Sequence, residues 1–210
     1  MYSVNEFFCI PEGLDKKTCD KIRNLAKGKW RESKVNTKKD ITAEERKTGE
    51  KLTHDIDKNE RISDIVWTTD QWIFDTISPY LNGANERAGW KYDINGAESI
   101  QITRYKKGGF YSFHRDGKGD HLSAYHFPDD KFIHGHVRKL SMTVLLNDDY
   151  EGGELQFATY DKEKCNISTA KINKTGSIIV FPSSMEHRVA PVTKGIRYSL
   201  VIWFTGPPFR

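Results

Sequence analysis

The sequence is poor in cysteine, in long apolar runs and in excess charge of either sign. Its three cysteines, Cys9, Cys19 and Cys165, are odd in number and widely spaced, with no Cys-x-x-Cys pair. This predicts free thiols in a reducing compartment rather than a disulfide framework. No apolar stretch approaches the ~18 residues that cross a membrane, and the first residues lack a basic start followed by an apolar run. We therefore expect a soluble, cytoplasmic protein without a membrane partner.

The charges are close to balanced, since 33 Lys and Arg are interleaved with 29 Asp and Glu for a formal net charge of +4. No basic stripe is present, so the composition does not indicate a nucleic-acid partner. A length of 210 residues with 12% aromatics suits one domain with a sizeable core. We predict a single domain over 1–210, with helical and other supporting elements in 1–92 and a catalytic core in 93–210.

Helical periodicity is confined to the first part of the chain. Apolar or small residues recur at helical spacing after Asp15, with Gly28 as a stop, and again over 69–88. A short strand is expected at 7–10. The predicted apolar faces consist of Cys19, Ile22, Leu25 and Ala26 in the first helix, and of Trp72, Ile73, Ile77, Tyr80, Leu81, Ala84 and Ala88 in the second.

From residue 92 onward, short strand patterns separated by Gly and Asp turns replace the helical spacing. Such a run after N-terminal helices predicts a mainly β protein, with a jelly-roll (double-stranded β-helix) core buttressed by helices. The open mouth between two such sheets is a usual place for a small-molecule site. The candidate strands are 98–105, 110–114, 139–146, 154–160, 165–172, 177–181, 186–192 and 196–204.

Two histidines and one carboxylate form the clearest chemical pattern. His114 and Asp116 are separated by one residue, so on an extended strand both side chains point to the same face. His187 supplies a third potential ligand far downstream. Two imidazoles and one carboxylate leave open positions on a metal, as in non-haem Fe(II) oxygenases. We therefore expect His114, Asp116 and His187 to bind Fe(II) and to leave room for O2 and a cosubstrate.

An arginine within an apolar strand suggests how the cosubstrate is held. 2-Oxoglutarate would chelate iron through its keto acid end and leave its distal carboxylate deep in the barrel, where an unpaired charge is costly. Arg197, ten residues after His187, offers a planar fork to such a carboxylate. By strand alternation Ser199 and Trp203 share its face. Ser199 is expected to add a hydroxyl group, and Trp203 to wall the pocket.

Three further residues are candidates for the pocket. Tyr105 lies nine residues before His114 and is expected to hydrogen-bond the cosubstrate. Tyr111 would face away from His114 on a regular strand. It is kept as a candidate for substrate contact, together with Arg138 and Trp203.

Several short motifs occur in a fixed order, namely Tyr105, His114-x-Asp116, Asp149-Tyr150-Glu151-Gly152-Gly153-Glu154-Leu155, Phe181-Pro182-Ser183-Ser184, His187-Arg188-Val189 and Pro191-Val192-Thr193-x-Gly195-x-Arg197. With them, the segment from about Ile100 to Phe204 resembles the prolyl hydroxylase branch of the Fe(II)/2-oxoglutarate-dependent dioxygenases. The resemblance implies a double-stranded β-helix, Fe(II), O2 and 2-oxoglutarate, with ascorbate as a reductant. It also implies hydroxylation of a C–H bond, with release of succinate and CO2. One departure is Val144-Leu145, on the strand where oxygen-sensing members carry a second cosubstrate tyrosine.

The resemblance leaves the substrate open. A prolyl residue in a protein or peptide is the first expectation, and a free amino acid or small molecule is the alternative. A third possibility is a non-catalytic module that binds metal and 2-oxoglutarate. Asp116 argues against the related halogenases, which leave that position to chloride. Trp203 stands where the nucleic-acid demethylases of the superfamily carry a second arginine.

Two polar segments, 31–58 and 117–137, are expected to be loops that close over the substrate. The second segment contains four of the seven histidines: His121, His126, His134 and His136. His134 and His136 would share a strand face and could chelate a metal, but no Cys or suitably spaced carboxylate completes a closed site. A loop that borders the active site is the preferred interpretation.

Overall fold

The computed structural model describes residues 6–36, 54–117, 124–126, 128, 133–161 and 164–209. Within these ranges the chain forms two helices and a set of antiparallel strands. In order they are β1 (Phe8–Ile10), α1 (Lys16–Leu25), β2 (Arg31–Glu32), β3 (Val35–Asn36), β4 (His54–Asp55), β5 (Arg61–Ile62), β6 (Asp64–Thr68), α3 (Gln71–Arg87), β7 (Gly96–Ala97), β8 (Ile100–Tyr105), β9 (Phe110–His114), β10 (Val137–Leu145), β11 (Glu151–Gly152), β12 (Leu155–Asp161), β13 (Lys164–Thr169), β14 (Ile178–Pro182), β15 (Glu186–Val189), β16 (Val192–Lys194) and β17 (Arg197–Gly206).

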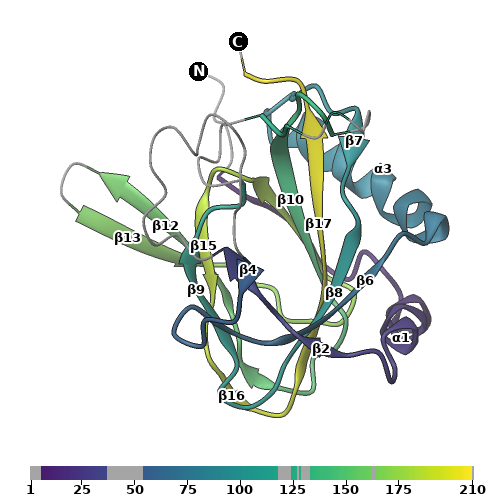
Figure 1. Cartoon of the computed structure of the whole chain (residues 1–210), viewed down its shortest axis with the longest axis vertical. Coiled ribbons are helices and arrows are strands. Elements are labelled where there is room, and N and C mark those ends of the chain that lie inside the picture. The colour runs from purple at the N-terminus through teal and green to yellow at the C-terminus, as the bar shows by residue number, and fades with distance from the viewer. Residues whose placement is uncertain are drawn as a thin grey trace.

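The larger sheet has the strand order β1-β14-β10-β17-β8-β6-β2, and β7 pairs with β17 off this path. Because side chains alternate along a strand, one face of this sheet carries apolar residues such as Ile102, Met142 and Leu200, all fully buried against the helices. The other face turns toward the smaller sheet and carries the polar residues Thr103 and Ser199. Figure 1 shows helices α1 and α3 on one side of this sheet and strands β9, β12 and β15 on the other.

The helices form where the apolar spacing predicted them. Helix α1 begins after Asp15, whose carboxylate accepts a 2.6 Å hydrogen bond from the Thr18 backbone N–H. This bond satisfies one of the free donors of the first turn. Both helices bury their apolar faces in a common core with the larger sheet, through Cys19 and Ile22 of α1 and Ile73, Ile77, Leu81 and Ala84 of α3.

The smaller sheet has the strand order β13-β12-β15-β9-β5. Its inner face meets the larger sheet in a second core, where the Phe157 ring packs edge-on against Phe181 at 5.1 Å between centroids. The strands β9 and β15 lie side by side in the middle of this sheet. Residues on them therefore face the polar side of the larger sheet across the mouth of the barrel.

The predicted mainly β fold with a jelly-roll core and supporting helices is confirmed, and the strand boundaries agree within a few residues. Three differences stand out. The predicted strand 186–192 is two strands, β15 and β16, separated near Pro191, whose lack of an N–H interrupts the ladder. The strands β5 and β6 were not predicted, although Ile65 and Val66 carry the β-branched signal. The supposed loop 31–58 forms strands β2, β3 and β4 at its ends, and its residues 37–53 lie outside the described ranges.

All three cysteines are free thiols, as predicted. Cys19 of α1 is buried, Cys9 is half-buried and Cys165 is exposed. Within the described ranges, no helix is both long and apolar enough to cross a membrane.

Candidate active site

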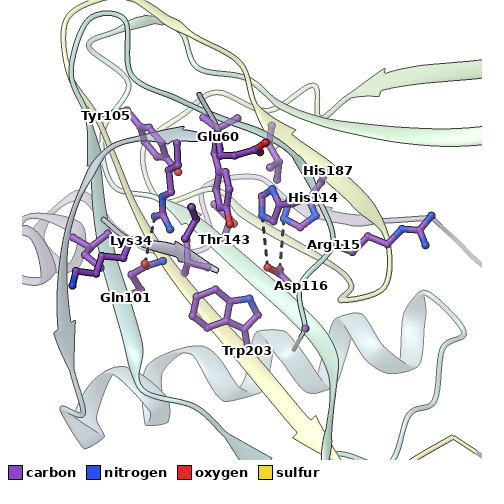
Figure 2. Close-up of a pocket in the computed structure, with 18 of the residues that line it drawn as sticks. Lys34, Glu60, Gln101, Tyr105, His114, Arg115, Asp116, Thr143, His187 and Trp203 are labelled. Carbon is purple, nitrogen blue, oxygen red and sulfur yellow. Dashed lines mark hydrogen bonds and ion pairs between the residues drawn. The ribbon is translucent and has the colours of Figure 1, made fainter. Parts of the chain in front are cut away.

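The two histidines and the carboxylate predicted to bind metal converge on one point. His114 is the last residue of β9, and its Cα partner across the sheet is His187 on β15. Asp116 follows the strand end by two residues, so it belongs to the turn after β9 rather than to the strand face that was predicted. Its Oδ1 lies 3.7 Å from His114 Nε2, and its Oδ2 lies 3.6 Å from His187 Nε2. In Figure 2 the three side chains point toward one another.

Both imidazoles are oriented by the chain itself. The Nδ1 of His114 is 2.8 Å from the Ser112 carbonyl oxygen, and the Nδ1 of His187 is 2.9 Å from the Met185 carbonyl oxygen. A proton on each Nδ1 donates to that carbonyl and leaves the Nε2 lone pair free to bind a metal. The three ligand atoms lie within 4.8 Å of one another, and no other group of three potential ligands occurs in the described part of the chain. The donor set fits Fe(II).

The Asp116 carboxylate is held by Ser141, which the sequence did not single out, and Ser183 supports both residues. The Ser141 hydroxyl donates to Asp116 Oδ2 at 2.7 Å and lies 2.9 Å from the Ser183 hydroxyl. The Asp116 backbone N–H donates to the Ser183 carbonyl oxygen at 3.0 Å. Both serines are fully buried. They come from β10 and from the turn after β14, so their pairing with Asp116 depends on the tertiary fold.

The protonation states at this centre suit metal binding. Burial lowers the pKa of His114 to about 3, so its imidazole is neutral at physiological pH. Burial alone would raise the pKa of Asp116, but His187, His114, Arg138 and the Ser141 hydroxyl together hold it below its usual value. A neutral imidazole beside an ionised carboxylate requires no proton to leave before the metal enters.

Tyr111 lies on the same side as His114, contrary to the prediction for a regular strand. The Tyr111 ring stacks on the His114 ring at 3.6 Å between centroids and 17° between planes. The cause is an irregularity in the pairing of β9 with β15. His114 pairs with His187 and Tyr111 with Val189, so three residues on β9 span two on β15. The extra residue turns Tyr111 into the cavity.

Arg197 and Ser199 lie at the bottom of the barrel. Each is 1% exposed, and Arg197 Nη1 donates to the Ser199 hydroxyl at 2.9 Å. Arg197 Nε has no hydrogen-bond partner within the described structure, and no Asp or Glu described there pairs with this guanidinium. A buried cation without a counter-charge fits the distal carboxylate of 2-oxoglutarate.

The Arg197 guanidinium lies next to the cavity, behind the Tyr105 side chain. Tyr105, which lines the cavity, has its ring centroid 5.5 Å from Arg197 Cζ. Neither Arg197 nor Ser199 is itself part of the lining. Gly153, with a φ of +70°, makes room for the arginine, because a Cβ there would lie 2.8 Å from Arg197 Cδ.

Arg138 and Trp203 line the cavity on the larger sheet, with Trp203 further along β17 from Arg197. The Arg138 Nε and Nη2 donate to the two carboxylate oxygens of Glu98, each at 2.6 Å. The Arg138 Cζ also lies 4.1 Å from the centroid of the Trp203 ring. Trp203 Nε1 is buried and without a hydrogen-bond partner in the described structure. The ion pair with Glu98 and the contact with Trp203 therefore hold Arg138 in place where both side chains line the cavity.

The cavity has a volume of about 1310 Å³, and strands that the sequence did not predict form part of it. Arg61 of β5 and Trp67 of β6 line it beside Gln101 of β8. Arg61, Ser63, Ile65 and Trp67 alternate along this stretch but mix polar and apolar types, so no regular apolar period marked this wall in the sequence. The segments 31–35 and 56–61 border the cavity, but closure over a substrate stays a prediction.

The histidine-rich segment shows no second metal site within its described residues. His126 and His134 have ring centroids 5.3 Å apart, without a third potential ligand within reach. The idea that His134 and His136 share a strand face is wrong, because residues 133–135 form a turn. His121 lies outside the described residues, as do most of residues 118–132.

Comparison with known proteins places this site in a family. A sequence model of the 2OG-Fe(II) oxygenase superfamily matches residues 100–205, just over half of the chain. A PKHD-type hydroxylase of Xylella fastidiosa strain M12 is 34% identical over 113 residues, and one of Synechococcus sp. strain JA-2-3B'a(2-13) is 34% identical over 110 residues. These matches cover 49% and 50% of this chain, and 42% of each relative's length.

Solved structures share the fold at low sequence identity. The viral collagen prolyl hydroxylase of Paramecium bursaria Chlorella virus-1, solved with 2-oxoglutarate, has a TM-score of 0.61 at 20% identity, covering 96% of this chain and 97% of that one. A Trichoplax adhaerens prolyl hydroxylase, in complex with a hypoxia inducible factor peptide, has a TM-score of 0.58 at 17% identity, covering 95% and 83%. These likenesses confirm the jelly roll, and the match of the family model to the segment that carries His114, Asp116 and His187 shows that the chain belongs to the 2OG-Fe(II) oxygenase superfamily.

Proposed function

We propose that the protein hydroxylates a prolyl residue in a protein or peptide, using Fe(II), O2 and 2-oxoglutarate. One oxygen atom of O2 enters the C–H bond of the substrate and the other enters succinate, while the cosubstrate loses CO2. The observation that carries the proposal is the convergence of His114, Asp116 and His187 in a cavity walled by Tyr111 and Trp203. The prolyl hydroxylases among the structural neighbours and the PKHD-type hydroxylases support this choice of chemistry.

Different residues would bind the metal and the cosubstrate. His114, Asp116 and His187 would hold Fe(II), which supplies the reduction of O2 coupled to decarboxylation of 2-oxoglutarate. Arg197 would pair with the distal carboxylate of the cosubstrate, with Ser199 and Tyr105 beside it. Ascorbate is expected to keep the iron reduced. Phe181, which packs on His187 and lines the cavity, would shield the reacting atoms from water on that side.

The substrate would lie in the part of the cavity between Tyr111 and Trp203, away from Arg197. A pyrrolidine ring presents a compact apolar surface that packs on aromatic rings, and Tyr111 and Trp203 offer two of them. Burial raises the pKa of Tyr111 to about 12, so its hydroxyl stays protonated and can donate to a peptide carbonyl. Trp203 Nε1 is a second donor without a partner in the described structure. Arg138 is held by Glu98 and would position the Trp203 ring.

The test is coupled turnover. The purified protein with Fe(II), ascorbate and 2-oxoglutarate is given a proline-containing peptide, the same peptide with alanine in place of proline, or free L-proline. The proposal predicts succinate release matched by a gain of one oxygen on the proline peptide alone. Oxygen gain on free proline alone would favour the amino-acid hydroxylase. A protein that binds metal and 2-oxoglutarate but yields no succinate would be a binding module.

A further inference from the structure

Two arginines near the metal centre lack a carboxylate partner, and the distal carboxylate of 2-oxoglutarate can neutralise only one of them. Arg197 is 1% exposed and Arg61 is 8% exposed. Among the residues that the structure describes, neither forms an ion pair with Asp or Glu. A guanidinium removed from water without a counter-charge is costly, so each position is suited to an anion. If 2-oxoglutarate occupies Arg197, a second anion is needed at Arg61.

Arg61 is fixed in place and lies close to the reacting centre. Its Nε donates to the Ser63 hydroxyl at 2.8 Å, and its Nη2 donates to Gln101 Oε1 at 3.4 Å. Its Cζ lies 4.6 Å from the centroid of the Tyr111 ring, which in turn stacks on His114. One aromatic ring therefore separates the guanidinium from a metal ligand. Unlike Arg197, Arg61 lines the cavity itself.

The surroundings of Arg61 do not neutralise it. Ser63, Gln101 and Tyr111, which contact the guanidinium, all have neutral side chains. Glu60, the adjacent residue, is exposed and makes no ion pair with it in the described structure. A neutral carbonyl could accept a hydrogen bond here but would leave the charge unbalanced. A carboxylate satisfies both the hydrogen bonds and the charge.

We propose that Arg61 binds a carboxylate of the substrate, close to the carbon that is hydroxylated. Two sources share this chemistry: the α-carboxylate of a free amino acid, and an Asp or Glu side chain next to the target proline in a peptide. The inference rests on the proposed function, since it concerns the substrate of the same centre. It adds the requirement that the substrate carries a negative charge, which neither the fold nor the metal ligands imply.

The test measures binding rather than turnover. Calorimetric titrations use the full chain loaded with Mn(II) and 2-oxoglutarate in the absence of O2. The probes are two matched pairs, L-proline with L-prolinamide, and acetyl-Glu-Pro-Gly-amide with acetyl-Gln-Pro-Gly-amide. At least one acidic probe should bind about tenfold or more tightly than its amide partner, the range expected of hydrogen bonds to a charged group. The pair that shows the preference identifies the source of the carboxylate.

The variants separate Arg61 from the general charge of the cavity. Arg61→Gln should abolish the preference and leave the affinity for 2-oxoglutarate unchanged, whereas Arg61→Lys, which keeps the charge, should retain part of it. Arg31→Gln is the matched control, because Arg31 is an exposed cation on the rim of the same cavity. It should keep the full preference. Unfolding midpoints confirm that each variant is folded.

Three results would overturn the inference. The first is equal binding of both members of both pairs, including no binding at all. The second is an equal loss of preference in Arg31→Gln. The third is a loss of 2-oxoglutarate affinity in Arg61→Gln, which would assign Arg61 to the cosubstrate. Acid preference without oxygen gain on any proline substrate would refute the proposed function and leave this inference standing.

Discussion

Replacing Ser141 with alanine tests whether residues behind the metal ligands set the metal affinity. The change removes the hydroxyl that donates to Asp116 Oδ2 at 2.7 Å, in a position that is 0% exposed. A hydrogen bond to an ionised carboxylate contributes about 1.5–3 kcal/mol, and loss of such supporting contacts weakens metal binding about 10- to 100-fold. We expect Ser141→Ala to weaken Mn(II) binding by that range. The loss should come from a carboxylate that is both less fixed and easier to protonate.

The protonation effect has a definite sign. The Ser141 hydroxyl is one of the groups that hold the pKa of Asp116 below its usual value, so its removal raises that pKa. Protons then compete with metal at a higher pH. The affinity of Ser141→Ala should therefore begin to fall at a higher pH than that of the wild type.

Ser183→Ala is the matched control for this experiment. The Ser183 hydroxyl is 2.9 Å from the Ser141 hydroxyl but makes no hydrogen bond to the Asp116 carboxylate in the described structure. It should weaken Mn(II) binding clearly less than Ser141→Ala. The assay is a calorimetric Mn(II) titration at several pH values, with thermal unfolding of the metal-free proteins as a check on folding. An affinity of Ser141→Ala within about twofold of the wild type, or an equal loss in Ser183→Ala, would refute the reasoning.

Three further predictions concern positions around the cavity and on the surface. Gly153→Ala should destabilise the protein by about 1–2 kcal/mol, because the residue has a left-handed φ of +70°. It should also weaken 2-oxoglutarate binding, because the added Cβ displaces Arg197. The Mn(II) affinity, measured in the same titration, should be unchanged. Glu98→Gln leaves the largely buried Arg138 guanidinium without its counter-charge, so urea unfolding should show a loss of up to about 3 kcal/mol and the KM for a peptide substrate should rise. Iodoacetamide should modify Cys165 of the native protein first, because this thiol is exposed, whereas burial raises the pKa of the Cys9 and Cys19 thiols to about 11. Mass spectrometry should show one rapid adduct. Rapid modification of Cys9 or Cys19 would contradict the described packing.

The convergence of His114, Asp116 and His187 could be predicted because the pattern depends on short sequence spacings. His114 and Asp116 are two residues apart, and the motifs before and after His187 are short and specific. Even there the backbone differed from the expectation, since Asp116 lies beyond the end of β9. This difference does not change the predicted ligand set, because the three side chains still meet at one point.

The cavity wall could not be predicted in the same way, because it depends on contacts between distant strands. Tyr111 faces His114 only through an irregular pairing with β15. Ser141 reaches Asp116 across 25 residues of sequence, and Arg61 reaches Gln101 across 40. The strand β5 has two residues, too few for a periodic signal. A polar composition over 31–58 also concealed the buried positions Ser33 and Val35.

We expect binding of the cosubstrate to depend both on the buried Arg197 and on the metal. The most direct test is a titration of 2-oxoglutarate onto the Mn(II)-loaded protein without O2, repeated without metal and with Arg197→Met. We expect one 2-oxoglutarate site, whose affinity falls strongly when the metal is removed and at least tenfold in Arg197→Met. The Mn(II) affinity of the variant should be unchanged. Binding that is indifferent to both the metal and Arg197 would contradict this expectation.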